Sequence, residues 1–436
     1  PQNLKELGIQ VAIIRPGPLQ GNMVNPYIRR KNGEEPVTHL HPSLEPILSE
    51  TLGVILFQEQ VLKVAVTIAG FSAGQAENLR KAMSKKRSRQ AMEAIKVEFI
   101  EGAFKRGVQR EEAEQIYATL DGFALYGFCK SHAMAFAKIV YQSAWLKRYY
   151  PAHFISAIIN HQPMGFYPRE VLIQDLKHLG IDVLPVCVMQ SRPWCHLEYG
   201  HVRLGLMMIH GMGYETAIKI TRERTISPFK SIFDFMKRIK IGEQLLEKMS
   251  RSGAFDQIDT QRRKNLWQGW LYKHVENPLI HWEPQAPELP DFDSWDELKN
   301  EYQVLGFSAK HHPIGLMREN LQKRRILSSR QLAERNDGEY LQVAGMVVCR
   351  QKPPTAKGFG FLTIEDESGM INLVIPPDPL KKHAILFRRA GFLIARGKKM
   401  SRDGVVNVRV QSLQELELRE TAILQKGIET SMKTFA

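Results

Sequence analysis

Long apolar segments are absent from this sequence of 436 residues. The longest runs, such as Val54–Phe57 and Phe392–Ala395, are far shorter than the roughly 20 residues that a membrane-spanning helix needs. We therefore expect no membrane span. Glycine (31 residues) and proline (23 residues) occur near their average frequencies, which excludes a collagen-like or low-complexity chain.

Cysteine is scarce, and its four copies are scattered. No C-x-x-C pair occurs, so the spacing disfavours a zinc site, and we expect no metal-binding residues. Free thiols spread in this way are typical of a reducing compartment, which predicts a cytoplasmic protein. The four residues are Cys129, Cys187, Cys195 and Cys349.

An initiator methionine and a charged-then-apolar leader are also lacking. The chain begins Pro1-Gln2-Asn3-Leu4, and residues 9–14 already resemble the interior of a folded domain. We therefore expect a piece of a longer chain. Hydrophobic residues make up 43% and charged residues 24%, as is usual for globular proteins, and the length allows about two to four domains.

The charge is strongly one-sided. The chain has 60 Lys and Arg residues against 46 Asp and Glu, a formal net charge of +14. An excess of this size favours a polyanionic partner, most often nucleic acid, or an anionic membrane surface. Many basic proteins bind neither, so charge alone does not decide between these alternatives.

Three-and-four spacing of apolar residues predicts that residues 1–190 are mostly helical. The clearest helix covers 131–149, with one expected buried face. Two more are expected over 90–104 and 110–120. The expected face of the first helix consists of Ala133, Phe136, Ala137, Val140, Tyr141 and Ala144.

From residue 340 the apolar pattern changes to period two, which predicts short strands. A helical stretch, Pro379–Arg389, falls between the third and fourth strands. Five strands with a helix in that place are typical of the oligonucleotide/oligosaccharide-binding (OB) barrel. The fold class is therefore α+β and multidomain, with helical sections before a terminal five-stranded OB-type β-barrel. The strands are expected at Leu341–Val347, Phe359–Glu365, Met370–Ile375, Phe392–Lys398 and Val405–Val410.

The segment Leu79–Arg87 holds five cations in nine residues and no acid. On a helix, Arg80 and Lys81 lie on adjacent faces and can border one groove, where Arg offers a bidentate fork and Lys a point charge. This pattern predicts a phosphate clamp. The alternative is an ordinary solvated helix face.

A second segment, Gly122–His132, ends where the clearest helix begins. Ser131 is expected to be the N-cap, and the first-turn amides with Lys130 and His132 favour an anion. Tyr126 stands next to a glycine and could present its ring to a base or sugar. The alternative is a capped helix with a packed aromatic loop.

The segment Leu204–Gly213 contains a G-x-G turn at Gly211 and Gly213. Such a turn between two short helices lets backbone amides grip a DNA phosphate without reading sequence, as in a helix–hairpin–helix. Lys219, Arg222 and Arg224 follow and favour DNA. The alternative is a plain helical hairpin.

The expected barrel is basic as well, with nine Lys or Arg and one acid between Lys381 and Arg409. A cationic groove with aromatic stacking predicts single-strand binding. Phe359, Phe361 and Phe392 are stacking candidates, although strand aromatics are more often core.

Four motifs in order resemble the fingers of bacterial C-family DNA polymerases, the polymerase III alpha subunit and its relatives. They are Ile14–Gln20, Gly53–Gln60, Leu79–Lys86 and Tyr126–His132. The resemblance continues through Ser252–Asp256, Leu305–Phe307, His311–Pro313 and the barrel. The segments Asn160–Tyr167, Lys357–Gly358 and Phe361–Gly369, with a short linker, are similar to the error-prone, damage-associated branch.

The resemblance implies template-directed addition of deoxynucleotides to a primer, with two Mg²⁺ ions held by acidic palm residues. Those aspartates are expected upstream of Pro1, so no catalytic residue is expected in this chain, and we expect the chain alone to be inactive. Pro290–Asp293 resembles a paired-aspartate motif, but it follows the fingers in a proline-rich linker and is rejected as catalytic.

The resemblance also implies roles for particular residues. Nucleotide-binding roles are implied for Arg80, Lys81, Tyr126, Lys130, Ser131 and His132, and the family often has Arg at position 81. DNA-binding roles are expected for Gly211, Gly213, Lys219 and Arg222. Expected partners are primer-template, single-stranded DNA and deoxynucleoside triphosphates. Residues 258–290 lack a clamp-binding peptide, which implies recruitment through accessory damage-tolerance proteins and a sliding clamp through them.

The expected domains are fingers (1–190), a helix–hairpin–helix section (191–273), a proline-rich linker and connector (274–337), the OB barrel (338–418) and a tail (419–436). A different class remains open, a non-catalytic nucleic-acid-binding scaffold that uses the same basic surfaces. Codons upstream of Pro1 would separate the two, because only the polymerase needs paired palm aspartates there.

Overall fold

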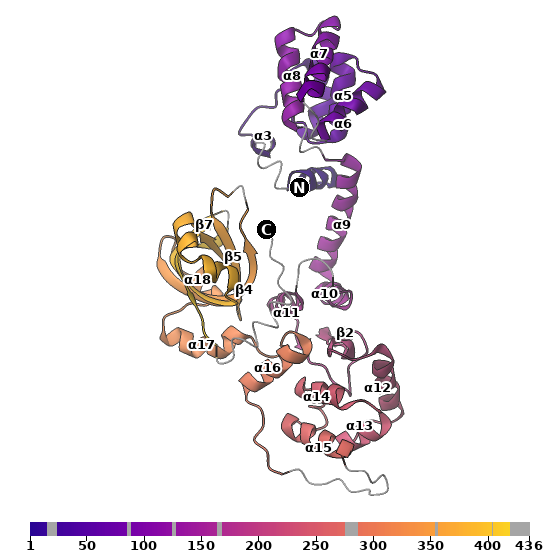
Figure 1. The fold of residues 1–436 in the computed structure, drawn as a ribbon, viewed down its shortest axis with the longest axis vertical. Helices are drawn as coiled ribbons and strands as arrows, with labels where there is room; N and C mark the ends of the chain where they lie inside the picture. The colour runs from indigo at the N-terminus through magenta and orange to yellow at the C-terminus, as the bar shows by residue number, and fades with distance from the viewer. Residues whose placement is uncertain are drawn as a thin grey trace. The chain divides into compact units, whose positions relative to one another are not determined.

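The computed structural model describes residues 1–14, 24–84, 89–123, 128–163, 168–274, 287–353, 356–402 and 404–418. The chain divides into two compact units, residues 1–145 and 146–436 (Figure 1). Each is considered by itself below. Among the described residues, no helix is both long enough and apolar enough to cross a membrane.

Unit 1 is helical. Its main core lies between α5, α6, α7 and α8, where Leu79, Phe99 and Leu120 are fully buried. The two helices expected over 90–104 and 110–120 are confirmed as α7 and α8. The elements are α1 (Leu4–Ile13), α3 (Val24–Lys31), η1 (Pro42–Leu44), α4 (Glu45–Leu48), η2 (Ser49–Thr51), α5 (Gln58–Ala69), α6 (Ala73–Ser84), α7 (Arg89–Lys105), α8 (Arg110–Phe123) and α9 (Lys130–Tyr149).

The expected buried face of α9 is wrong beyond its first turns. Ala133 and Ala137 are buried, and Ala133 packs in a cluster with α1 and with Leu56 and Phe57 before α5. Phe136, in contrast, is 44% exposed and Tyr141 60% exposed. Val140 and Ala144 are exposed too. Helical periodicity shows which residues share a face, but burial also needs a packing partner. The buried residues of α9 are Ala133 and Ala137, both near its start.

Unit 2 begins with helices around a small three-stranded sheet of order β1-β3-β2. One core extends from α10 to α16 and includes Leu204, Phe235, Phe255 and Phe307. The elements before the barrel are α10 (Pro151–Asn160), α11 (Arg169–His178), β1 (Val183–Leu184), β2 (His196–Glu198), β3 (His201–Arg203), η3 (Leu206–Met208), α12 (Tyr214–Ile226), α13 (Ile232–Arg238), α14 (Glu243–Arg251), α15 (Arg262–His274), α16 (Ser294–Leu305), α17 (Pro313–Lys323) and α18 (Ser329–Ala333).

The C-terminal part is a closed five-stranded barrel of order β4-β5-β6-β8-β7, closed by the parallel pair β6–β8. The five expected strands are confirmed, and β4, β7 and β8 extend further than the period-two pattern suggested. The expected helical stretch is two short helices. The elements are β4 (Tyr340–Gln351), β5 (Gly360–Asp366), β6 (Gly369–Ile375), α19 (Pro377–Lys382), α20 (Ala384–Arg389), β7 (Phe392–Arg402) and β8 (Val405–Glu415).

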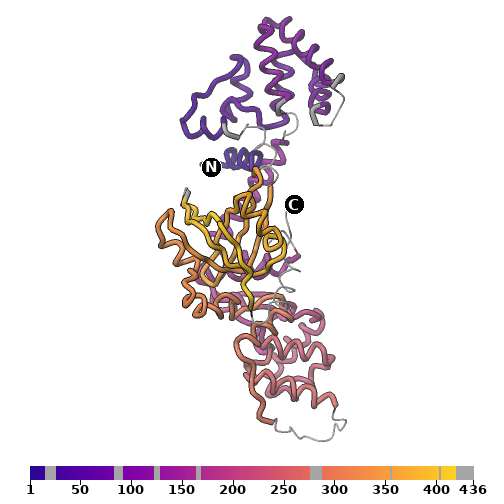
Figure 2. The backbone as a smooth tube through the Cα atoms, turned by 60° about the vertical axis from the view of Figure 1, so that its left-hand side comes forward, coloured from indigo at the N-terminus to yellow at the C-terminus, as the bar shows by residue number. Residues whose placement is uncertain are grey.

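Helices α16 and α17 cover part of the outer surface of the barrel (Figure 2). Tyr302 of α16 and Ile314 of α17 share a buried cluster with Met346 of β4 and Phe392 of β7. The barrel interior is a separate apolar cluster that includes Ile364, Leu373 and Val408. The barrel therefore has apolar side chains on both faces of β4 and β7. Phe392 is core, as the stacking alternative anticipated.

Candidate nucleotide and nucleic-acid interface

The start of α5 and the start of α9 are joined by hydrogen bonds in unit 1. Gln58 donates its backbone N–H to the carbonyl of Phe128 at 2.9 Å, beside a Phe57–Phe128 bridge. The Glu59 carboxylate accepts the backbone N–H of Lys130, with both oxygens 3.0 Å away. The segment at 128–132, expected from sequence to approach a nucleotide, is thus placed by α5.

Ser131 is not the N-cap of this helix. The helix begins at Lys130, and the carboxylate of Glu59 satisfies the first-turn amide instead of a Ser131 hydroxyl. The Ser131 hydroxyl lies 3.3 Å from the Cys129 thiol and is exposed. A carboxylate from another helix outcompetes a local cap here because its charge complements the helix dipole. The sequence near Ser131 carries no signal of this.

Arg80 and Lys130 are both held by acids. Arg80 makes a bidentate pair with Glu77, at 2.6 and 2.8 Å, and reaches the Gln58 side-chain oxygen at 3.2 Å. Its hydrogen bonds to Glu77 raise the pKa of Arg80 further and lower the pKa of Glu77. The Lys130 ammonium pairs with Glu50.

Lys81 is the more open cation of this helix. Its ammonium lies 3.8 Å from Glu77, and its side chain is 56% exposed against 28% for Arg80. His132 is exposed and lies in an aromatic row, with its ring 5.4 Å from Phe128 and 4.5 Å from Phe136. Tyr126 and the cations at 85–87 lie outside the described residues.

We name Gln58, Glu59, Glu77, Arg80 and Lys130 the finger cluster. Sequence reasoning missed its acids, although Glu77 stands three residues before Arg80, a spacing that brings side chains together on a helix. Gln60 of the same motif has a structural role. Its side-chain oxygen accepts the amides of Leu56 and Phe57 at 2.9 and 3.0 Å, which fixes the turn into α5.

The G-x-G turn of unit 2 joins η3 to α12. Ile209 and Met212 point into the core. Gly211, which precedes Met212, and Gly213, which follows it, are exposed. Gly211 has a φ of +94°, which favours glycine, and Gly213 is the N-terminal boundary of α12 without a side-chain cap. The amides that start α12 are thus left without a capping side chain.

A second turn that also ends in a glycine N-cap precedes α14, and sequence reasoning missed it. Ile239 and Ile241 are buried, while Lys240 and Gly242 are exposed. The backbone of Gly242 (φ −74°, ψ 159°) matches that of Gly213 (φ −80°, ψ 148°). A search for an apolar residue followed directly by a glycine at the start of an expected helix would have found both.

Lys219 and Arg222 are exposed one turn apart on α12 and have no hydrogen bond or ion pair with another described residue. Lys248 of α14 lies beside Gly211, since a Cβ at Gly211 would be 3.4 Å from its ammonium. Arg224, in contrast, donates to the carbonyls of Val188 and Ser191 and is structural. Of the α12 cations, Lys219 and Arg222 are therefore available to a ligand, whereas Arg224 is engaged within the fold.

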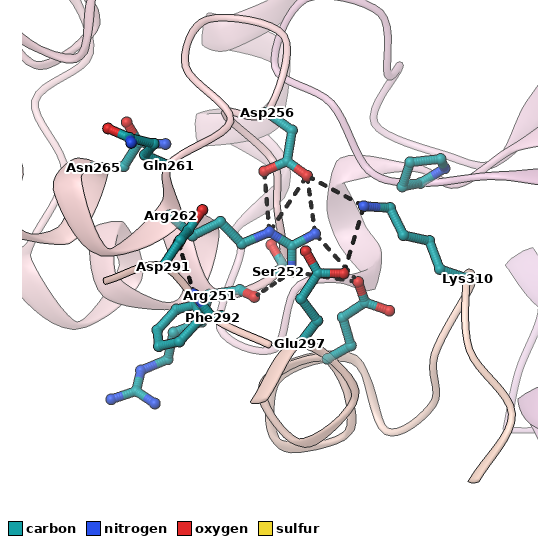
Figure 3. Close-up of polar contacts among 12 residues, drawn as sticks. Arg251, Ser252, Asp256, Gln261, Arg262, Asn265, Asp291, Phe292, Glu297 and Lys310 are labelled. Atoms are coloured by element: carbon teal, nitrogen blue, oxygen red, sulfur yellow. Dashed lines mark hydrogen bonds and ion pairs between the residues drawn. The ribbon is translucent and has the colours of Figure 1, made fainter. Parts of the chain in front are cut away.

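The motif Ser252–Asp256 builds a joint between α15 and α16 (Figure 3). Arg262 is 1% exposed and pairs with Asp256 at 2.9 Å and with the buried Glu301 at 3.4 Å. Gly253 has a φ of +75°, and a Cβ there would fall 2.3 Å from the Arg262 guanidinium. Glycine at 253 is thus required by the arginine that crosses it.

The joint extends to His311. Its ring lies 3.2 Å from Glu297, and this hydrogen bond, with the charges of Arg262 and Lys310, lowers the pKa of Glu297 to about 2. The Ser252–Asp256 and His311–Pro313 motifs are therefore structural. Among the described residues, no group of three or more His, Cys, Asp or Glu side chains is arranged to hold a metal ion.

Three family models match the chain in order. The finger domain of the bacterial DNA polymerase III alpha subunit matches residues 1–107, a helix-hairpin-helix motif matches 180–265, and an OB-fold nucleic acid binding domain matches 341–416. The first match includes Gln58, Glu59 and Arg80 of the finger cluster and ends before Lys130. The second includes both glycine turns, and the third covers the closed barrel. Fold and matches together define a polymerase III alpha-type protein with nucleic-acid-binding modules.

Three curated relatives illustrate the match. The chain is 40% identical to an error-prone DNA polymerase of Anaeromyxobacter dehalogenans, over 96% of this chain and 38% of the relative. It is 38% identical to one of Corynebacterium glutamicum, over 96% and 40%. It is 36% identical to one of Methylococcus capsulatus, over 95% and 42%. The chain corresponds to the finger, helix–hairpin–helix and OB-fold region of bacterial error-prone DNA polymerases and spans about two fifths of these relatives' length.

Proposed function

We propose that this chain provides the incoming-nucleotide and DNA contacts of an error-prone DNA polymerase that acts in damage-associated DNA synthesis. The finger cluster carries the proposal, because α5 brings Arg80 of α6 and Lys130 of α9 to one place. The nucleotide-binding residues are Arg80, Lys81, Tyr126, Lys130, Ser131 and His132. The proposed domain limits are those expected from the sequence, with fingers up to residue 190.

The acids of the cluster suggest how a triphosphate would enter. Arg80 stays charged beside Glu77, and a triphosphate would compete with Glu77 for the guanidinium fork. Lys81, more exposed, would meet a phosphate first. Glu77 thereby keeps Arg80 aimed while the site is empty, at the expense of nucleotide affinity.

DNA would be held by the two glycine turns. Their uncapped helix starts offer backbone amides to phosphates, and Lys219 and Arg222 add charge without reading sequence. The two Mg²⁺ ions of polymerase chemistry would be bound by palm carboxylates outside this chain. Accessory damage-tolerance proteins, and a sliding clamp through them, are the proposed protein partners.

The test is Arg80→Ala in the full-length polymerase. Loss of one charge-assisted contact, about 1.5–3 kcal/mol, should lower the efficiency of single-nucleotide incorporation by roughly ten- to a hundredfold. Primer-template affinity should change little, and Lys81→Arg is the tolerated control. If Arg80→Ala weakens DNA binding and leaves incorporation intact, Arg80 contacts template or primer and the assignment is wrong.

A further inference from the structure

The outer surface of the barrel changes from apolar to cationic along one pair of strands. In the antiparallel pair β4–β7, outward residues face each other in successive rows. The first two rows are buried under α16 and α17, and the next two are not covered by them. The buried rows are Met346–Phe392 and Ala344–Ile394, and the open rows are Gln342–Arg396 and Tyr340–Lys398.

The open rows continue onto β8, where Arg409 pairs with Lys398 and Ser412 pairs with Arg396. Arg396, Lys398 and Arg409 are exposed and have no hydrogen bond or ion pair with another described residue. Like charges directly opposite each other on a sheet are destabilising. The direct Lys398–Arg409 pair therefore indicates an anion that neutralises both.

An aromatic ring lies beside these cations. Tyr340 pairs with Lys398 across β4 and β7 and is 59% exposed. Single strands bind where a cationic track adjoins aromatic rings, because each base can stack whatever its sequence. We name Tyr340, Arg396, Lys398 and Arg409 the β4–β7–β8 face.

The usual binding face of such barrels is less suited to this role here. OB barrels commonly bind along their second and third strands, which are β5 and β6. These strands contain no Lys or Arg, and the sequence-based stacking candidate Phe361 lies on β5. Lys399 of β7 points inward and donates to the carbonyls of Ala333 and Arg335. Among the barrel-strand cations whose side chains the structure describes, the unpaired ones are thus Arg396, Lys398 and Arg409, all on the β4–β7–β8 face.

We infer that this barrel binds single-stranded DNA on the β4–β7–β8 face, with phosphates along Arg396, Lys398 and Arg409 and a base stacked on Tyr340. The inference rests on the proposed DNA-binding function and specifies its single-strand site. The surface differs from the β5–β6 surface that fold class alone would suggest.

The experiment is anisotropy titration of labelled oligothymidylate with the 436-residue chain over a range of salt concentrations. Tyr340→Ala should weaken binding by about five- to 150-fold. The triple variant Arg396→Ala/Lys398→Ala/Arg409→Ala should lower the slope of log affinity against log salt by about 2. The matched control is Lys323→Ala/Arg324→Ala/Arg330→Ala, which removes the same charge from exposed residues of the α17–α18 region and should keep the wild-type slope.

Two results would overturn the inference. In one, both face variants bind like the wild type while Phe361→Ala loses affinity, which places the strand on β5–β6. In the other, the control triple loses as much slope as the face triple, which shows that net charge alone governs binding. A wild-type chain that fails to bind oligothymidylate rejects the proposed single-strand function itself and is recognised before any variant is measured.

Discussion

The buried arginine at the joint between α15 and α16 makes a quantitative stability prediction (Figure 3). Arg262→Ala leaves Glu301, which is 1% exposed, without its cation and removes the main partner of Asp256. Breaking a buried ion pair on one side costs about 3–5 kcal/mol, because the remaining charge keeps its desolvation penalty. We therefore expect Arg262→Ala to lower the free energy of unfolding by an amount in this range.

Urea unfolding followed by tryptophan fluorescence measures this loss, because Trp267 and Trp270 lie on α15 and Trp295 lies on α16. Arg263→Ala is the matched control, since its side chain is 40% exposed, pairs with Asp296 at 3.3 Å and lies over the Phe292 ring. It should cost less than about 1 kcal/mol.

A second change separates the charge effect from lost packing. Glu301→Gln in the Arg262→Ala background removes the orphaned charge, while its amide oxygen can still accept from Ser308. Part of the stability should therefore return. If Arg262→Ala costs no more than Arg263→Ala, or if Glu301→Gln destabilises the variant further, the buried ion pair does not stabilise the joint as argued.

Three further outcomes are expected. Burial raises the pKa of Glu365 to about 9, so the folded state keeps a proton that the unfolded state loses. The free energy of unfolding should therefore fall by up to about 2–3 kcal/mol between pH 7 and 9. In urea titrations, Glu365→Gln should reduce this dependence of stability on pH. Lys219→Ala/Arg222→Ala should reduce the salt slope of duplex binding by about 2 at every sequence tested, whereas a loss limited to one sequence would contradict a phosphate role. Primer extension by the 436-residue chain with Mg²⁺ should be undetectable, and activity that survives removal of host polymerases would refute this.

Local patterns in the sequence predicted the regular elements well. The alternation of apolar residues from Leu341 onwards indicates a strand with one face inside a barrel. Side chains alternate along any strand, so this pattern can be recognised from neighbouring residues alone. The start of α9 was harder to predict. Its first amide is satisfied by Glu59, about seventy residues earlier, so no local capping rule identifies it.

Charge patterns predicted free cations only where the fold supplies no partner for the side chain. Arg80 was chosen from a segment without acids, yet Glu77 just before that segment and Gln58 from another helix hold its guanidinium. Lys399 and Arg224 look like their exposed neighbours in sequence, but both donate to backbone carbonyls inside the fold. Composition cannot separate such cations, because their partners come from other elements.

Because α16 and α17 cover part of the barrel, they affect where a shorter fragment that contains the barrel can begin. A fragment that starts at residue 338, where the barrel strands begin, would uncover Ala344, Met346, Phe392 and Ile394 on a sheet surface that α16 and α17 otherwise keep from water. Exposed apolar strand surfaces promote association between chains. The shortest piece expected to keep this sheet surface covered therefore starts before Ser294 and contains the barrel together with both helices.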